Sequence, residues 1–329
     1  MGSPRRADRD VDATRRRAAF ERDGLVVVPG LIEPELVERL RADLEYRWTR
    51  RPVIGGRIQD LWVRSPTVRR LAAHPAVLAA LADLYGRRAI PFQTLNFRVG
   101  TEQPLHADSI HFDTVPTGWM CGVWVALEDV GDEQGPLSWV PRSQHLEGPD
   151  AEQFGGGAGR FDDVAYEAAV AHAAAEAGLE TEHVHANAGD CVVWSAGVFH
   201  GGATVNDPDR TRWSQVTHYV FEGLPAVTPQ RSRPSLGRWW LRDPLVNVAT
   251  LGVEREVDTE LGAVAPLRLP GGLVRFPNPG TGEPPTSRRV YSAVVGAGRR
   301  IRSLPRRVRA GCAREARPPT VGSGAGALR

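Results

Sequence analysis

The chain has 329 residues, 41% hydrophobic and 24% charged, with a formal net charge of +2. No apolar run approaches the roughly 20 residues that span a bilayer, so we expect a cytoplasmic protein without a membrane span. All 41 basic residues are arginine, which excludes Schiff-base and P-loop lysine chemistry, and the three cysteines are too few for a disulfide framework or a thiolate metal cluster.

Helical patterns dominate the first third of the chain. Residues 1–12 are charged and poor in apolar side chains, so we expect them to be frayed. A helix is predicted over 13–23, followed by a short strand at Leu25–Val28. Leucines that recur every four residues predict an amphipathic helix over Pro34–Trp48, and two more helices are expected to begin at Ser65-Pro66 and at His74-Pro75.

After residue 86 the pattern changes to short runs rich in β-branched and aromatic residues, separated by turn signals. Strands are predicted over 90–99, 120–127, 137–140, 191–194 and 213–221. The alanine-rich interval 166–177 predicts an inserted helix, which we expect to be peripheral. Strands that follow helices, with irregular turns between them, indicate a mainly β fold, a sandwich or barrel with flanking helices.

The C-terminal part carries no pattern of an independent core. We expect a single domain over 13–260, a Pro/Gly-rich extension over 261–287 and an arginine-rich tail over 288–329. From Arg288 onwards 11 arginines accompany one acid, Glu315, with Tyr291 as the one aromatic residue. A basic segment can bind nucleic acid, but without interleaved aromatic residues we expect a solvated tail and no nucleic-acid partner.

Two histidines and two aspartates fall within eight positions, 106–113. In an extended segment, residues two apart point to the same side, so His106 and Asp108 can close on one cation. Neutral imidazole and ionised carboxylate are suitable Fe(II) ligands. His111 and Asp113 have the same spacing, so alternation alone does not choose between the two pairs.

The best third ligand is His200, which follows the strand-like run 191–194. Two histidines and one carboxylate form the facial triad of non-haem Fe(II) oxygenases, which leaves coordination positions open. Arg212 follows twelve residues later in a strand-like segment and can grip a distal carboxylate in bidentate fashion, with the Ser214 hydroxyl on the same face. Arg210 has the same parity but lies in a turn, which makes it the weaker candidate.

The chain carries an ordered set of motifs that resembles the phytanoyl-CoA dioxygenase family of Fe(II)/2-oxoglutarate-dependent oxygenases. The resemblance covers about residues 20–222 and rests on His106-Ala-Asp108, Gly122-Val-Trp124, Gly135-Pro-Leu137, Val140-Pro141, His200-Gly-Gly and Thr211-Arg212 through His218-Tyr219. It implies a double-stranded β-helix, the jelly roll of cupin-like barrels. It also implies that His106, Asp108 and His200 hold iron and that Arg212 binds the C5 carboxylate of 2-oxoglutarate. A departure appears at Arg142, where relatives usually have glycine.

Further site residues follow from the resemblance. Trp124 resembles the tryptophan that lines the cosubstrate pocket, and Gln93 and Asn96 look like polar contacts on an adjacent strand. The family pattern favours His106-Ala-Asp108 over the second pair, so His111 becomes a substrate-facing residue. Trp119 is a further candidate for the wall of the substrate pocket.

The implied activity is that of a non-haem Fe(II)/2-oxoglutarate-dependent dioxygenase. With dioxygen, such an enzyme hydroxylates or otherwise oxidises a C–H bond of a small organic metabolite, here in a biosynthetic pathway, and releases succinate and CO2. Because Asp108 keeps the carboxylate, halogenation is disfavoured. The alternatives are a jelly-roll protein that binds a metal without redox chemistry and a Zn-dependent hydrolase. Neither alternative needs a buried guanidinium such as Arg212.

Overall fold

The structure is a computed structural model that describes residues 6–50, 53, 56–157, 159–254, 267–268 and 273–275. All of these lie within one compact unit, 1–284. The arginine-rich tail expected over 288–329 lies outside the described residues, as does most of the extension expected over 261–287. No helix in the described part is long and apolar enough to cross a membrane.

Four helices form the first layer: α1 (Arg6–Asp23), α2 (Pro34–Trp48), α3 (Pro66–Ala72) and α4 (Pro75–Tyr85). A proline at the first turn pre-sets the backbone of α2, α3 and α4, and the Ser65 hydroxyl accepts a hydrogen bond from Val68 N at 3.1 Å. The predicted leucine stripe of α2 is buried, with Leu40 and Leu44 fully inaccessible. The helix expected from residue 13 begins at Arg6, so residues 6–12 are helical rather than frayed.

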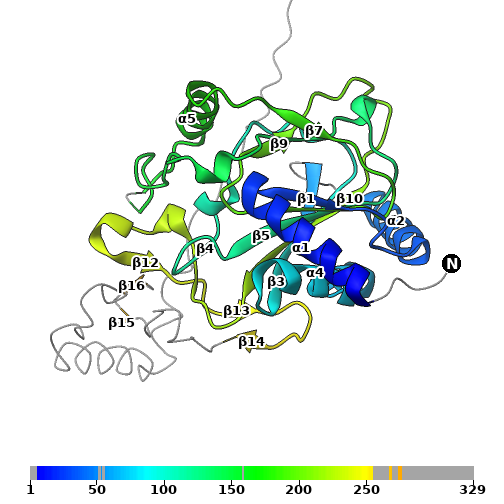
Figure 1. The fold of residues 1–329 in the computed structure, drawn as a ribbon, viewed down its shortest axis with the longest axis horizontal. Coiled ribbons are helices and arrows are strands. Elements are labelled where there is room, and N and C mark those ends of the chain that lie inside the picture. The colour runs from blue at the N-terminus through cyan, green and yellow to red at the C-terminus, as the bar shows by residue number, and fades with distance from the viewer. Residues whose placement is uncertain are drawn as a thin grey trace, which may run out of the picture. The chain divides into compact units, whose positions relative to one another are not determined.

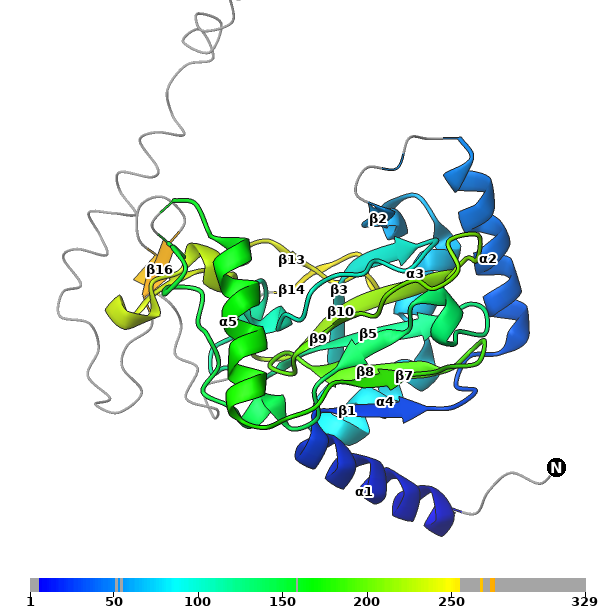
Figure 2. The ribbon, with the colours of Figure 1, turned by 90° about the horizontal axis from the view of Figure 1, so that it is seen from above.

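Six antiparallel strands form the major sheet, which runs across the middle of Figure 1. In spatial order they are β1 (Leu25–Val28), β8 (Cys191–Ser195), β5 (Met120–Ala126), β10 (Ser214–Phe221), β3 (Ala89–Phe97) and β2 (Arg57–Gln59). Figure 2 shows β3, β10, β5, β8 and β1 side by side. The strands predicted over 90–99, 120–127, 191–194 and 213–221 are thereby confirmed, and the sheet joins segments far apart in the sequence.

A smaller sheet faces the major one and consists of β7 (Glu182–Val184), β6 (Leu137–Trp139) and β9 (His200–Gly202). In Figure 1 it lies above the major sheet, whereas α4 lies below and α1 passes in front of the sheet. The other pairings are β4 (Asp113–Thr114) with β11 (Ala226–Val227), β13 (Leu245–Val246) with β14 (Val253–Glu254), and β16 (Leu273–Arg275) with β12 (Arg238–Trp240) and β15 (Leu267–Arg268). The fold is therefore mainly β with flanking helices, as predicted.

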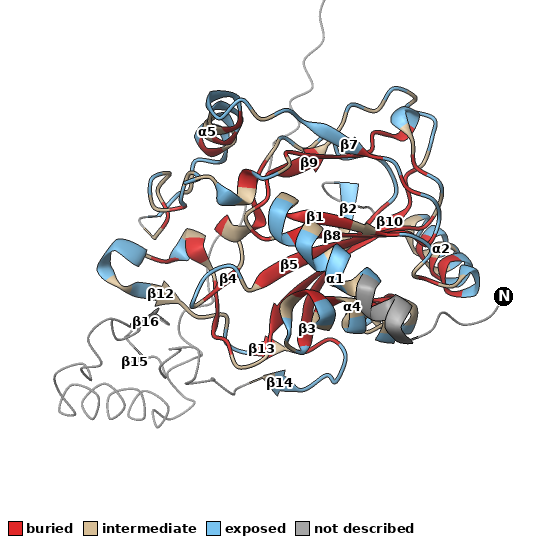
Figure 3. Ribbon diagram, viewed as in Figure 1, coloured by how far each residue is buried: buried red, intermediate tan, exposed pale blue. Residues whose placement is uncertain are grey.

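Strand alternation divides the interior into two cores. On β5, Val123 and Val125 pack with the helices α1–α4, whereas Trp124 and Ala126 point between the two sheets. Both faces of the major sheet are covered, so its central strands are buried along their whole length, as the red strands of Figure 3 show. The space between the sheets is where side chains of β3, β5, β8 and β10 can meet those of β9.

Helix α5 (Asp163–Glu176) stands apart from the other helices (Figure 2). The Asp162 carboxylate caps it by accepting a hydrogen bond from Ala165 N at 3.0 Å. Tyr166 and Val170 are buried against the loops that follow β3 and β6. The helix was expected to be peripheral; most of it is exposed, but Tyr166 in its first turn is buried and reaches the interior.

The family-atypical Arg142 occupies a turn in the left-handed region, with φ of 69°. Its backbone N–H donates to Asp23 O at 2.9 Å, which ties the turn to the end of α1. The turn thus keeps a backbone that glycine adopts freely, and arginine carries the steric cost of its Cβ there, about 1 kcal/mol.

Replacing Arg142 by glycine should therefore stabilise the protein by roughly 0.5–1 kcal/mol, because the Cβ strain is removed while the turn is retained. The free energy of unfolding from urea denaturation measures this. Arg142→Ala is the matched control, since it removes the exposed side chain and keeps the Cβ. Equal stability of the glycine and alanine variants would show that the turn is unstrained.

Candidate active site

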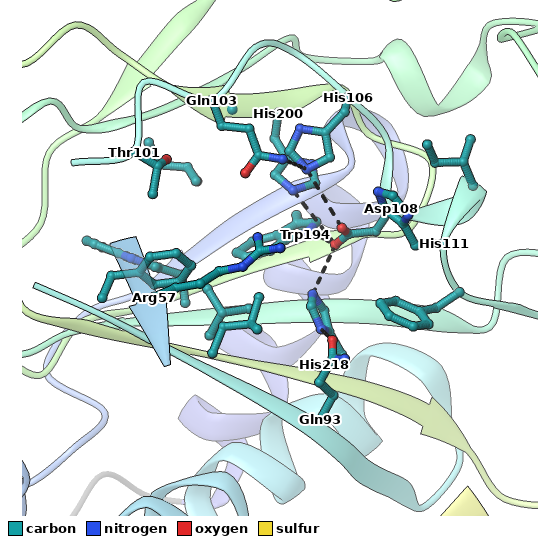
Figure 4. A pocket seen from close by; sticks show the side chains of 18 of the residues that line it. Arg57, Gln93, Thr101, Gln103, His106, Asp108, His111, Trp194, His200 and His218 are labelled. Atoms are coloured by element: carbon teal, nitrogen blue, oxygen red, sulfur yellow. Dashed lines mark hydrogen bonds and ion pairs between the residues drawn. The ribbon is translucent and has the colours of Figure 1, made fainter. Parts of the chain in front are cut away.

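The structure brings His106, Asp108 and His200 together between the two sheets, as predicted (Figure 4). His106 and His200 lie directly opposite each other and exchange two backbone hydrogen bonds of 2.9 Å. Asp108 begins the short 3₁₀ helix η3 (Asp108–Ile110), which turns its carboxylate toward both rings. The three candidate ligand atoms lie within 4.8 Å of one another, and all three residues are buried.

Backbone carbonyls orient both histidine rings. Nδ1 of His106 lies 2.9 Å from Pro104 O, and Nδ1 of His200 lies 3.0 Å from Val198 O. A carbonyl only accepts, so each Nδ1 carries the proton and each Nε2 presents a lone pair. The Nε2 atoms lie 3.9 Å and 3.7 Å from the oxygens of Asp108. This is the arrangement that a metal ion with nitrogen and oxygen ligands requires.

The protonation states also suit a cation. Burial lowers the pKa of His106 to about 4, and it lowers the pKa of His200 as well, so both rings are neutral near pH 7. Burial alone would raise the pKa of Asp108, but the surrounding imidazoles become charged as the pH falls, His200 having the strongest effect, and this charge holds the pKa of Asp108 well below its usual value. An ionised carboxylate with two neutral imidazoles is a ready ligand set.

The two glycines after His200 allow a second segment to pass close by. A Cβ on Gly201 would lie 2.4 Å from Gln103 O, and one on Gly202 would lie 2.8 Å from the Thr101 hydroxyl. Any larger residue would push the segment that carries His106 away from β9. Steric crowding therefore explains why glycine occupies both positions after His200.

The triad opens into a cavity of about 340 Å³ that also contains Arg212. Arg212 is 4% exposed, and burial lowers the pKa of its guanidinium to about 10, so it is charged. Its NH1 donates to Gly135 O at 2.5 Å, whereas Nε and the Ser214 hydroxyl have no partner among the described residues. Arg210 is instead exposed beside Glu133, 3.4 Å away. A buried, incompletely paired guanidinium calls for an anion.

Three other predicted residues line the cavity: Gln93, His111 and Trp124. Gln93 is not free, because its side-chain oxygen lies 2.9 Å from Nδ1 of His218. His111 lies on the opposite side of the triad from Arg57 in Figure 4, with its ring centroid 6.5 Å from that of His106.

Two predicted residues lie elsewhere and are corrected here. Asn96 points to the helical face of β3, where its amide donates to the Gln215 side chain at 3.2 Å. It differs in parity from Gln93, and alternation sends the two to opposite faces. Trp119 packs with Tyr85 and Phe221 in the helix layer, with ring centroids 6.2 Å and 6.3 Å away, so it does not line the cavity.

Sequence reasoning missed several residues at the site. Asp163, Tyr166 and Glu167 line the cavity from the first turn of α5, the helix that was expected to be peripheral. Trp194 donates through Nε1 to Asp108 at 2.8 Å, and Nε2 of His218 lies 3.4 Å from the same oxygen. His218 shares the parity of Ser214, so the alternation that selected Ser214 could have found it.

The competing pair, His111 and Asp113, is not a metal site. Asp113 forms part of β4, and its Oδ1 accepts backbone hydrogen bonds from Thr114 N at 2.8 Å and Gly118 N at 3.0 Å. Burial raises the pKa of Asp113 to about 7. Its carboxylate therefore stabilises the loop before β5, and the first pair forms the triad.

Comparison with known proteins agrees with this geometry. The family model described as phytanoyl-CoA dioxygenase (PhyH) matches residues 20–212, more than half of the chain. The chain belongs to the phytanoyl-CoA dioxygenase family. No match was found among curated proteins.

Two solved structures of other proteins have a fold similar to that of this chain. The epimerase SnoN, in complex with Fe3+, alpha ketoglutarate and nogalamycin RO, is 25% identical, with a TM-score of 0.57 over 75% of this chain and 97% of SnoN. The alpha ketoglutarate dependent carbocyclase SnoK from nogalamycin biosynthesis is 18% identical, with a TM-score of 0.55 over 68% of this chain and 89% of SnoK. The jelly-roll architecture implied by the sequence is thereby confirmed.

The raised pKa of Asp113 predicts that its ionised carboxylate lowers the free energy of unfolding in a pH-dependent way. The pKa in the folded protein exceeds that in the unfolded chain, so this destabilisation is absent below about pH 4 and reaches its full size as the pH rises to about 7. Asp113→Asn keeps the acceptor for both backbone N–H groups and should stabilise the protein by roughly 2–4 kcal/mol at pH 8.

Urea denaturation of Asp113→Asn and wild type at pH 4 and pH 8 measures the effect. The exposed Asp209→Asn serves as the control for the loss of a carboxylate. An Asp113→Asn gain of equal size at both pH values would contradict the raised pKa.

Proposed function

We propose that this protein is an Fe(II)/2-oxoglutarate-dependent dioxygenase that oxidises a C–H bond of a small organic metabolite in a biosynthetic pathway. The observation that carries the proposal is one cavity that holds both the buried His–Asp–His triad and the incompletely paired guanidinium of Arg212. A metal site alone would fit many proteins. The guanidinium adds the binding group for a dicarboxylate, which neither a metal-binding jelly roll nor a Zn-dependent hydrolase needs.

The donor set fits Fe(II). His106 and His200 would bind it through Nε2 and Asp108 through its carboxylate, which leaves positions open on the metal. Asp108 would fill the ligand position that halide takes when the carboxylate is replaced, so oxidation without halogenation is expected. Bound together, Fe(II) and 2-oxoglutarate use dioxygen to supply the oxidant that removes hydrogen from a substrate carbon, with succinate and CO2 as by-products.

The residues around Arg212 fit 2-oxoglutarate. The Arg212 guanidinium and the Ser214 hydroxyl would bind the distal C5 carboxylate, which satisfies the polar atoms that are otherwise buried without a partner. Trp124, 2% exposed, forms an apolar wall beside them and excludes water. Burial strengthens this ion pair, since a low local dielectric strengthens charge–charge attraction.

The substrate would enter on the side of His111 and α5. Ile110, Phe112 and Tyr166 supply apolar surface there, and His111 offers a ring nitrogen to orient a polar group. Such a mixture of apolar walls and few polar groups is typical of small-molecule sites. We assign His111 as a substrate-positioning residue on this basis.

Epimerisation is the second candidate outcome at the same substrate bond. SnoN, 25% identical, is an alpha ketoglutarate dependent epimerase from nogalamycin biosynthesis. Removal of hydrogen from a carbon centre is common to hydroxylation and to inversion of that centre. Hydroxylation would leave a new oxygen on the product, whereas epimerisation would leave its mass unchanged.

Succinate formation without the organic substrate tests the proposal, because a 2-oxoglutarate oxygenase converts some 2-oxoglutarate to succinate even when that substrate is absent. Protein would be incubated with Fe(II), ascorbate and 2-oxoglutarate, and succinate measured by mass spectrometry. We expect succinate from wild type, none from His106→Ala, and a rise of about 10- to 100-fold in the KM for 2-oxoglutarate in Arg212→Ala, since charged hydrogen bonds are lost.

Arg210→Ala is the matched control, since it removes an exposed guanidinium two residues from Arg212. It should behave as wild type. Equal succinate production by wild type, His106→Ala and Arg212→Ala would rule out the oxygenase. Metal binding without any succinate would favour the metal-binding protein or the hydrolase.

A further inference from the structure

One row of residues crosses the major sheet directly beside the triad. In register it runs from Gln93 on β3 through His218 on β10 and Gly122 on β5 to Trp194 on β8. Cross-strand neighbours share a face, and Gln93, His218 and Trp194 all line the cavity. His218 and Trp194 therefore flank Gly122 in this row, and both side chains can form hydrogen bonds.

Both side chains that flank Gly122 reach the same atom. Trp194 Nε1 lies 2.8 Å from Oδ2 of Asp108, and His218 Nε2 lies 3.4 Å from that oxygen. His218 is 4% exposed, so this contact is made away from water. Figure 4 shows His218 approaching Asp108 from the side opposite His106 and His200. Trp194 and His218 therefore contact Asp108 Oδ2 from the major sheet, whereas His106 and His200 lie on the opposite side of the carboxylate.

The ring of His218 is itself fixed. Its Nδ1 lies 2.9 Å from the side-chain amide of Gln93, which is 6% exposed. The Gln93 oxygen faces Nδ1. For Nε2 to donate to Asp108, the ring must carry both protons, or the amide must be turned so that its NH2 group donates to Nδ1. The ring also packs against Phe92 and Phe112, with centroids 6.1 Å and 5.5 Å away, which restricts its tilt.

Gly122 makes room for this arrangement. A Cβ at Gly122 would lie 2.3 Å from the Trp194 ring, closer than any real contact. A larger residue would push the indole away from Asp108. The glycine in the middle of a buried strand, normally unfavourable, thus has a local purpose.

We propose that His218, oriented by Gln93, is a positioning residue for the metal ligand Asp108. With Trp194 it contacts Oδ2 and so fixes the orientation in which the Asp108 carboxylate faces Nε2 of His106 and of His200. His218 is not a fourth ligand, because the ligand atoms grouped within 4.8 Å in the described chain belong to His106, Asp108 and His200 alone. The inference rests on the proposed metal site and assigns Gln93 to His218 rather than to the cosubstrate.

Binding of Ni(II), an air-stable probe of the Fe(II) site, tests the inference by isothermal titration calorimetry without any turnover. His218→Leu should weaken Ni(II) binding about 10- to 100-fold at an unchanged one-to-one stoichiometry, as expected for a residue that orients a ligand. His218→Gln places an amide N–H near the former Nε2 and should recover most of the affinity. Gln93→Leu should weaken binding less than His218→Leu.

A double variant separates positioning from general damage to the fold. If Gln93 acts only through His218, then His218→Leu with Gln93→Leu should bind Ni(II) no more weakly than His218→Leu alone. Thr217→Val is the matched control on β10, because Thr217 faces the helices and bonds Gln215. It should bind Ni(II) as wild type does, and thermal melts would confirm that each variant is folded.

Two results would overturn the inference while the metal site stands. Wild-type affinity in folded His218→Leu would remove the role of His218. Complete loss of binding, equal to that of His200→Ala, would make His218 a ligand rather than a positioning residue. Failure of wild type itself to bind Ni(II) would instead overturn the proposed function.

Discussion

The buried carboxylate of Asp108 is the constraint on which the site depends. Removing an ionised carboxylate from water is costly, and a protein retains one only where opposite charge or hydrogen bonds repay the cost. Here one indole N–H and the nitrogens of three imidazoles surround it, and two of those imidazoles present lone pairs through Nε2. Neutral rings with lone pairs do not neutralise a carboxylate. A metal cation bound by the carboxylate and the two Nε2 lone pairs would neutralise it, which explains why these three side chains are buried together.

The fold supplies this arrangement through strand pairing. His106 and His200 are held together by their own backbones, and the glycines that follow His200 let the two segments touch. The major sheet then places Arg212, Ser214 and Trp124 on the same interior face, with the helices on the other. Because both faces are covered, the cavity is walled by rigid, buried strands, which suits a site whose ligands must be held in place.

Alternation and spacing proposed the candidate ligands and the Arg212–Ser214 pair, but alternation did not choose between the two His–Asp pairs, and the resemblance to the family made that choice. Asn96 was placed with Gln93 on the resemblance alone, although the two differ in parity and alternation sends them to opposite faces of β3. The role of α5 could not be predicted, since its alanine-rich pattern shows no strong buried stripe and its contacts are with distant loops. His218 was missed because a lone histidine in a strand usually packs in the core. Alternation already places it on the face of Ser214, and the cross-strand register adds that it lies in one row with Trp194, the other side chain that contacts Asp108.

A crystal of the protein grown with Fe(II) and 2-oxoglutarate under anaerobic conditions, with anomalous diffraction at the iron edge, tests the central claim most directly. The account predicts one iron peak per chain, within coordination distance of His106, Asp108 and His200, with the distal carboxylate of 2-oxoglutarate against Arg212. An iron peak away from these three side chains, or a 2-oxoglutarate molecule that leaves Arg212 unpaired, would contradict it.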